Sequence, residues 1–280
     1  MDAMDKIDLH THSKVSDGQY APTELLQRAR AEGLETLALT DHDTTGGLIE
    51  AIGAARDLGM EFIPGIEMSA FVGDHEFHLL GHFIDPRDEA LSRFIDVVRG
   101  ARVVRVRRMV ERLRALGLGL TFEEVAAFAE GDSLGRTHLA QALLARGYVE
   151  DFQDAFRRYI GSGKPGFVEP MKVPADQAIA LLHGAGGTVT LAHGLAYGVT
   201  RAEIAQLEAE GLDGLEVDHP SHDDAMRRAL TAWAAEFDLI QTAGSDFHGE
   251  RIIPERRLCE CAMPRSALEA LRARRGGRTV

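Results

Sequence analysis

The chain has 280 residues, 45% hydrophobic and only 6% aromatic, so it can bury a large core made mainly of aliphatic side chains. Its formal net charge of −13 argues against a surface built to hold nucleic acid, because that affinity comes largely from Lys and Arg. No stretch is as long and apolar as a membrane span, and the N-terminus lacks the pattern of a secretion signal, so we expect a cytoplasmic globular protein with no membrane partner.

Short apolar runs alternate with amphipathic stretches of helical length along most of the chain. The first part has predicted strands at residues 7–9, 36–40 and 61–66, with helices at 23–32 and 46–58. The last part has strands at 188–192, 214–217 and 239–243, with helices at 174–185, 201–210 and 223–237. This alternation is typical of a parallel α/β sheet, and the chain length suits one barrel with an insertion.

One segment breaks the alternation and contains only predicted helices. These span residues 89–116, 122–130, 137–146 and 152–159. The segment follows Asp85-Pro86 and ends in a glycine-rich turn around residues 161–166, which suits a domain boundary. We predict an α/β barrel made of residues 1–89 and 166–280, with an all-α insertion at 90–165 that covers the site.

Side chains of the kinds that bind metals gather at the carboxyl ends of the predicted strands. They are His10, His12, Asp41, His42, Glu67, His193, Asp246 and His248. In a parallel barrel the carboxyl ends of the strands form one face, so these groups should converge there. Packing several imidazoles and carboxylates together is costly unless a cation holds them. The sequence therefore predicts a site for divalent metal ions.

Several ordered segments resemble those of the PHP (polymerase and histidinol phosphatase) family. They are Ile7-Asp8-Leu9-His10-Thr11-His12, Ser16-Asp17-Gly18, Leu39-Thr40-Asp41-His42-Asp43, Gly65-Ile66-Glu67, Ala192-His193 and Gly244-Ser245-Asp246-Phe247-His248. The resemblance spans nearly the whole chain. It implies a distorted (β/α)7 barrel with two or three divalent ions, manganese first, with iron or zinc as alternatives.

The same resemblance implies how the ligands divide among the ions. One ion would be held by His10, His12, Glu67 and Asp246; a second, bridged by Glu67, by His78 and His193; a third by Asp17, His42 and His248. Asp17 stands where other members carry histidine, so the third ion is expected to bind more weakly or to be a harder metal. His82 competes with His78, because alternation along a strand puts both on one face; family position favours His78.

Other histidines and two basic residues outside this set are also candidates for a role. His222, and with less support His219, follows a strand and is a candidate to protonate the leaving group or contact substrate, in addition to the catalytic role expected of Glu67 and Asp246. His138 lies on a predicted helix and is expected to be structural. Arg136 and Lys164 lie beside glycines and are candidates for phosphate binding, as in the family branch that acts on small nucleotides.

The arginines at residues 99–114 recur among valines and a leucine at helical spacing, which predicts a solvated basic face. The resemblance implies hydrolysis of a phosphomonoester, with the 3′-phosphate of nucleoside 3′,5′-bisphosphates as the first choice of substrate. Alternatives on the same site are a 5′-3′ exoribonuclease acting on short RNA, a histidinol phosphatase and a cyclic phosphodiesterase. A non-catalytic regulatory domain is disfavoured by the complete ligand set, and no obligate protein partner is indicated.

Overall fold

The computed structural model describes residues 4–129, 134–258 and 260–276, and a seven-stranded sheet forms its centre. Its strands, in spatial and chain order, are β2 (Ile7–Asp8), β3 (Thr36–Leu39), β4 (Glu61–Val72), β5 (His75–His82), β6 (Thr188–Leu191), β7 (Gly214–Asp218) and β8 (Ile240–Ala243). The two outer strands approach each other, since the Leu9 amide donates to the Ala243 carbonyl at 3.1 Å and Thr11 forms a parallel bridge with Phe247. The sheet is thus a nearly closed barrel, and the predicted α/β barrel class is confirmed.

Strands β4 and β5 depart from the parallel pattern. β5 is antiparallel to both β4 and β6, whereas the other neighbouring pairs of the barrel sheet are parallel. β4 runs for 12 residues, beyond the predicted end at residue 66, and turns directly into β5. Glu67 therefore lies within a strand and not after one. The hairpin places Glu67 and His78 at the same mouth of the barrel although their strands run in opposite directions.

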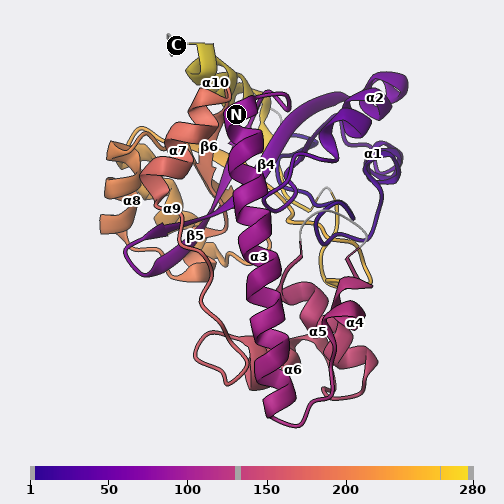
Figure 1. Cartoon of the computed structure of the whole chain (residues 1–280). Helices are drawn as coiled ribbons and strands as arrows, with labels where there is room; N and C mark the ends of the chain where they lie inside the picture. The colour runs from indigo at the N-terminus through magenta and orange to yellow at the C-terminus, as the bar shows by residue number, and fades with distance from the viewer. Residues whose placement is uncertain (1–3, 130–133, 259, 277–280) are drawn as a thin grey trace.

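Helices cover the outside of the barrel (Figure 1). They are α1 (Pro22–Ala31), α2 (Leu48–Leu58), α7 (Ala175–Gly184), α8 (Arg201–Ala209) and α9 (Asp224–Glu236), and they pack on the sheet through one large aliphatic core. The end of the barrel opposite the side chains predicted to bind metal is covered by α10 (Arg265–Gly276) and by the short pair β1 (Met4–Asp5) and β9 (Met263–Pro264), which were not predicted. In the part of the chain described, no helix combines the length and hydropathy that a membrane span requires.

The inserted segment forms helices with a hydrophobic core of its own. They are α3 (Glu89–Ala115), α4 (Phe122–Ala126), α5 (Arg136–Ala145), α6 (Phe152–Ala155) and a π-helical turn (Phe156–Ile160). Val106, Met109, Leu113, Leu139 and Leu143 are among the buried residues of this second core. Helix α3 runs from the barrel into the insertion, and α4, α5 and α6 lie beside its far half (Figure 1). Helix α4 is shorter than predicted, and Glu130 lies outside the described residues.

Candidate metal centre and its pocket

Histidines and carboxylates from separate strands meet at the mouth of the barrel. Four overlapping groups each offer ligand atoms within 4.8 Å of one another: His10, His12, Glu67 and Asp246; His12, Asp17, His42 and His248; His42, Glu67 and His78; and His10, Glu216 and His219. The first group matches one predicted ion site, and the second contains the whole of another. The structure thus brings together side chains that are more than 200 positions apart in the sequence.

Glu67 is the centre of this arrangement. It is fully buried, and its Oε1 lies 2.7 Å from His78 Nδ1 and 3.1 Å from His193 Nε2. Its Oε2 lies 3.2 Å from the Nε2 atoms of His10 and His12 and 3.1 Å from His42 Nδ1. One carboxylate therefore contacts five imidazoles, two through one oxygen and three through the other. This is the geometry expected of a bridging ligand.

Two other carboxylates complete the cluster. Asp246 Oδ1 lies 3.3 Å from His12 Nε2 and 3.4 Å from His248 Nδ1, and Asp17 Oδ1 lies 3.4 Å from His248 Nε2. Asp246 has a φ of 53° and His193 a φ of 30°, left-handed values that are uncommon for residues other than glycine. Such strained positions concentrate at functional sites, where the surrounding structure enforces them.

The donor set fits divalent metal ions. His12 Nε2, His42 Nδ1 and His78 Nδ1 are buried and make no well-directed hydrogen bond among the described residues, although carboxylate oxygens lie within 3.3 Å of each. Buried polar atoms that face one another without hydrogen bonds are costly, and a cation between them removes that cost. Mixed imidazole and carboxylate ligands suit manganese, iron and zinc.

The electrostatics of the cluster favour the metal-binding protonation state at Glu67, His42 and His193 but oppose it at His12. Burial opposes ionisation of Glu67, but the histidines around it outweigh burial and hold its pKa well below the usual value. Burial lowers the pKa of His42 to about 3 and that of His193 to about 4. Burial also opposes protonation of His12, yet Asp246 and Glu67 raise its pKa to about 10, so a metal ion must displace a proton there.

A second layer of carboxylates holds the ligands in place, and sequence reasoning missed its main member. Glu216, buried in β7, contacts His10 Nδ1 at 3.0 Å through Oε1 and accepts the His193 amide at 2.7 Å through Oε2. The sequence feature that could have indicated Glu216 is an acidic residue within the otherwise apolar predicted strand at residues 214–217. Asp41 instead accepts from Ser13 and Ser16, and so fixes the loop that carries Asp17.

The structure separates the histidines that the sequence left ambiguous. His82 is buried deeper in the barrel and donates from Nε2 to the Leu9 carbonyl at 2.9 Å, so His78 is the one that reaches Glu67. His219 Nε2 lies 3.7 Å from Asp246 Oδ2. His222 lies behind it, with ring centroids 5.3 Å apart, and its Nδ1 donates to the Val217 carbonyl at 3.1 Å. His219, and not the favoured His222, is therefore the one placed against the cluster.

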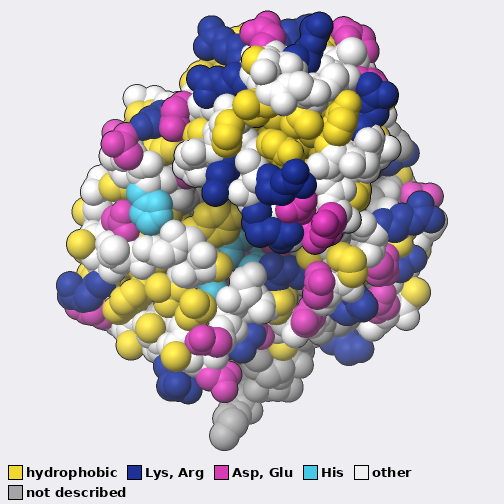
Figure 2. All heavy atoms as spheres, turned by 90° about the horizontal axis from the view of Figure 1, so that it is seen from below, with side chains coloured by type: hydrophobic (Ala, Val, Ile, Leu, Met, Phe, Trp, Pro, Cys, Tyr) yellow, Lys and Arg dark blue, Asp and Glu magenta, His cyan; other side chains and the backbone are white. Residues whose placement is uncertain are grey.

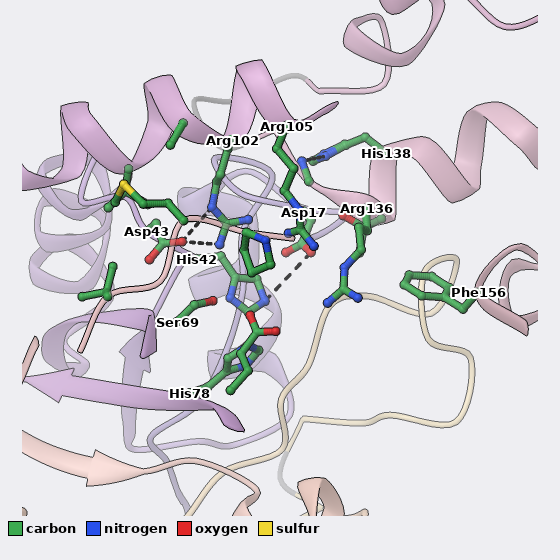
Figure 3. Close-up of a pocket in the computed structure, with 18 of the residues that line it drawn as sticks. Asp17, His42, Asp43, Ser69, His78, Arg102, Arg105, Arg136, His138 and Phe156 are labelled. Atoms are coloured by element: carbon green, nitrogen blue, oxygen red, sulfur yellow. Dashed lines mark hydrogen bonds and ion pairs between the residues drawn. The ribbon is translucent and has the colours of Figure 1, made fainter. Parts of the chain in front are cut away.

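A pocket of about 200 Å³ lies between the metal centre and the insertion. Asp17, His42 and His78 line it from the barrel, and Arg102, Arg105 and Arg136 line it from the insertion (Figure 3). His138 also lines it, and its Nδ1 accepts the Gly135 amide at the start of α5 at 3.0 Å, which is a structural role. Figure 2 shows a hollow with histidine side chains at its floor and basic side chains beside it.

Two arginines of α3 line the pocket, so the prediction that all the arginines at residues 99–114 form a solvated face is wrong. Arg102 and Arg105 turn into the pocket, because α3 crosses the barrel mouth and both residues lie at helical spacing from the buried Val98 and Met109. This spacing places both arginines on the buried side of the helix, and it is the sequence feature from which their position could have been predicted. Sequence reasoning assigned all the arginines of this segment to one exposed face.

Arg105 and Arg136 form a basic pair with an aromatic ring near both. Their guanidinium groups lie 5.4 Å and 5.8 Å from the ring centroid of Phe167. Arg105 donates from Nε to the Val168 carbonyl at 2.8 Å, and among the described residues neither arginine forms an ion pair. Burial, and then the charge of Arg136, lower the pKa of Arg105 to about 10. An anion bound between the two guanidinium groups would offset their electrostatic repulsion.

Lys164 does not reach this pocket. Its side chain is exposed on a turn closed by backbone hydrogen bonds, in which its amide donates to the Gly161 carbonyl at 3.0 Å and its carbonyl accepts from the Phe167 amide at 2.9 Å. This turn directs the lysine toward solvent. The predicted partnership of Arg136 with Lys164 is replaced by that of Arg136 with Arg105.

Comparison with known proteins gives consistent results. The PHP domain family model matches residues 8–165. A 3′,5′-nucleoside bisphosphate phosphatase of Chromobacterium violaceum is 39% identical, over 88% of each chain. A 5′-3′ exoribonuclease of Haemophilus influenzae is 37% identical, over 87% of this chain and 90% of that one. A structure from Bifidobacterium adolescentis, assigned as a metal-dependent phosphoesterase, superposes with a TM-score of 0.91 at 32% identity and covers 98% of both chains.

Proposed function

This chain belongs to the PHP domain family, and on that premise we propose that it removes the 3′-phosphate from nucleoside 3′,5′-bisphosphates. Both the similar solved structure and the similar phosphatase point to metal-dependent phosphoester hydrolysis. The proposal adds to this class a small substrate with two phosphates. A pocket of about 200 Å³ suits a small ligand better than a long polymer.

The metal-binding residues of the proposal are those that converge at the barrel mouth. They are His10, His12, Asp17, His42, Glu67, His78, His193, Asp246 and His248, for two or three divalent ions, manganese first. When bound, such ions acidify water and neutralise charge on a phosphoryl group. Glu67 and Asp246 supply negative charge to the cluster, and Glu216 orients His10 through the ring nitrogen that faces away from Glu67.

The observation that carries the choice of substrate is the pair Arg105 and Arg136. Both line the same pocket as His42 and His78, yet neither forms an ion pair with a carboxylate among the described residues, although Glu76 also lines the pocket. Two cations held near one ring form a fixed anion site at a distance from the metal-binding cluster. A substrate with one phosphate at each position would be held at both ends, which orients the scissile ester.

The leaving oxygen must gain a proton, and two histidines are candidates. His222 is the choice from sequence, and its Nε2 is buried without a hydrogen-bond partner among the described residues. His219 lies closer to the metal-binding cluster, beside Asp246. We assign the proton donation to this pair, with His219 nearer the reacting group, and the two are separable by substitution.

A panel of substrates tests the proposal. Steady-state assays would compare adenosine 3′,5′-bisphosphate, adenosine 3′-monophosphate, 5′-AMP, histidinol phosphate, a cyclic nucleotide and a short 5′-phosphorylated RNA. We expect kcat/KM for the bisphosphate to exceed that for adenosine 3′-monophosphate, which keeps the scissile ester but lacks the 5′-phosphate, by about ten-fold or more, the effect of one charge-assisted contact worth about 1.5 to 3 kcal/mol. Equal values would refute the two-phosphate model. A preference for RNA that falls steeply with salt would establish the exoribonuclease alternative instead.

A further inference from the structure

Asp43 occupies an unusual position directly after the metal-binding residue His42. Its φ is 47°, in the left-handed region that is uncommon for residues other than glycine, and its side chain is buried at 3% exposure. Its amide donates to the Glu67 carbonyl at 2.9 Å. The backbone turn that aims His42 at the cluster is thus strained, and it persists only if neighbouring groups hold it.

The group that holds it comes from the insertion. Arg102 of α3 donates from Nε to Asp43 Oδ2 at 2.7 Å, and its Nη2 contacts the same oxygen (Figure 3). The arginine is mostly buried, with 20% of its side chain exposed, so solvent screens this pair only weakly. A helix of one domain is therefore fixed by a charged pair to the loop that carries a metal-binding residue of the other.

His42 is the member of the cluster that most needs such support. Its side chain is 18% exposed, whereas those of His10 and His12 are fully buried. It is shared between two of the groups, with Nδ1 lying 3.1 Å from Glu67 Oε2 and Nε2 lying 4.0 Å from Asp17 Oδ2. A change in the turn after it would alter both contacts.

We propose that Arg102 is a positioning residue through which the inserted domain assembles the His42 side of the metal centre. The pair with Asp43 fixes the left-handed turn, and the turn fixes the direction of the His42 ring. The inserted domain is then required for full metal occupancy and is more than a cover over the pocket. The competing role for Arg102, also a pocket-lining residue, is a direct contact with substrate.

Metal titration of the full-length protein separates these roles, because it needs no substrate and is therefore independent of the proposed reaction. Metal-stripped protein would be titrated with Mn²⁺ by calorimetry. In Arg102→Ala we expect affinity for the most weakly held ion to fall by about ten-fold or more, with the tighter ions unchanged. Asp43→Asn should give the same loss, and the double variant should lose little more, because both changes break one pair.

Matched variants exclude a general effect on folding. Arg107 lies on the same helix but stacks 3.6 Å from the Phe122 ring within the insertion, so Arg107→Ala should keep every ion at wild-type affinity. Arg102→Lys keeps the charge without the planar fork and should fall between wild type and alanine. Wild-type ion affinities in Asp43→Asn would overturn the proposal, even if Arg102→Ala fails to fold. Unchanged ion affinities with a raised KM in Arg102→Ala would show that Arg102 binds substrate.

Discussion

The barrel mouth and the inserted helices line one pocket, but they bring different chemistry to it by different means. The mouth supplies imidazoles and carboxylates that lie within strands, as Glu67 and His78 do, or in the short segments that follow strands, as His10 and Asp246 do, so the sheet sets most of their positions. The insertion supplies arginines whose positions depend on where α3 and α5 cross the mouth. Strand register is set by hydrogen bonds within one sheet, whereas a helix crossing is the result of packing between the insertion and the barrel. The two regions should therefore respond differently to substitution.

The largest effect is expected in the barrel, at Glu67. Glu67→Gln keeps the shape of the side chain but removes the charge that faces five imidazoles. We expect loss of turnover to background together with loss of bound ions, measured by elemental analysis. A protein with the full metal count would remove Glu67 from its bridging role. Chelation of the wild type should likewise abolish activity, and Mn²⁺ should restore it.

The two histidines after β7 allow a comparison within the barrel. His219→Asn should lower kcat by about 100-fold or more if it donates the proton, the usual scale for loss of a general acid. His222→Asn should have a smaller effect, because His222 acts from behind His219. The readout is kcat across pH with metal content as control. A larger fall in kcat in His222→Asn than in His219→Asn would assign the proton donation to His222, as the sequence predicted.

Arg136 of the insertion should matter for substrate and not for metal. Arg136→Ala should lower kcat/KM on the bisphosphate by about ten-fold or more, since one charge-assisted contact is lost, while metal content stays unchanged. The same change should leave activity on adenosine 3′-monophosphate, which lacks the anchored 5′-phosphate, nearly unaltered. Lys164→Ala is the matched control, because its side chain points to solvent from the adjoining turn. A wild-type kcat/KM on the bisphosphate in Arg136→Ala would show that Arg136 does not bind the second phosphate.

The difference between the two regions also explains what the sequence could predict. His10 and Asp246 follow apolar strands, and their convergence follows from the geometry of a parallel barrel. The antiparallel direction of β5 was not predictable in this way, because its alternation of residues is the same in either direction. Arg105 was missed because its burial depends on the crossing of α3 over the mouth. Lys164 was misplaced because backbone bonds of its turn, and not its glycine neighbours, set its direction.

The smallest effect is expected at the far end of the barrel, at Glu61. Thr36 and Arg272 donate to it at 2.7 Å and 2.6 Å, and these contacts, with Arg265, outweigh burial and lower its pKa to about 2. Because the folded pKa is depressed, the stabilisation is full above the ordinary pKa of about 4.5 and is lost as pH falls toward 2. Glu61→Gln should cost about 1 kcal/mol or less at pH 7, since the groups are partly exposed.

Denaturant melts of wild type and Glu61→Gln at several pH values measure this difference. The two stabilities should converge as pH falls from about 4.5 toward 2. A difference that persists in acid would mean that the contribution comes from packing and not from charge. Metal content should not respond, since Glu61 lies at the opposite end of the barrel.

The pairing of β5 with β6 has a consequence for how the chain folds. Leu79 and Leu191 are partners in this ladder, and the whole insertion lies between them in the sequence. The helices of the insertion form mostly local contacts around their own core, which typically form fast, whereas closing this ladder brings distant segments together and is slow. We expect pulse-labelling hydrogen exchange to show protection in α3 and α5 before β5 and β6. Early folding of the insertion would then shorten the flexible loop between β5 and β6 that must close when these two strands pair.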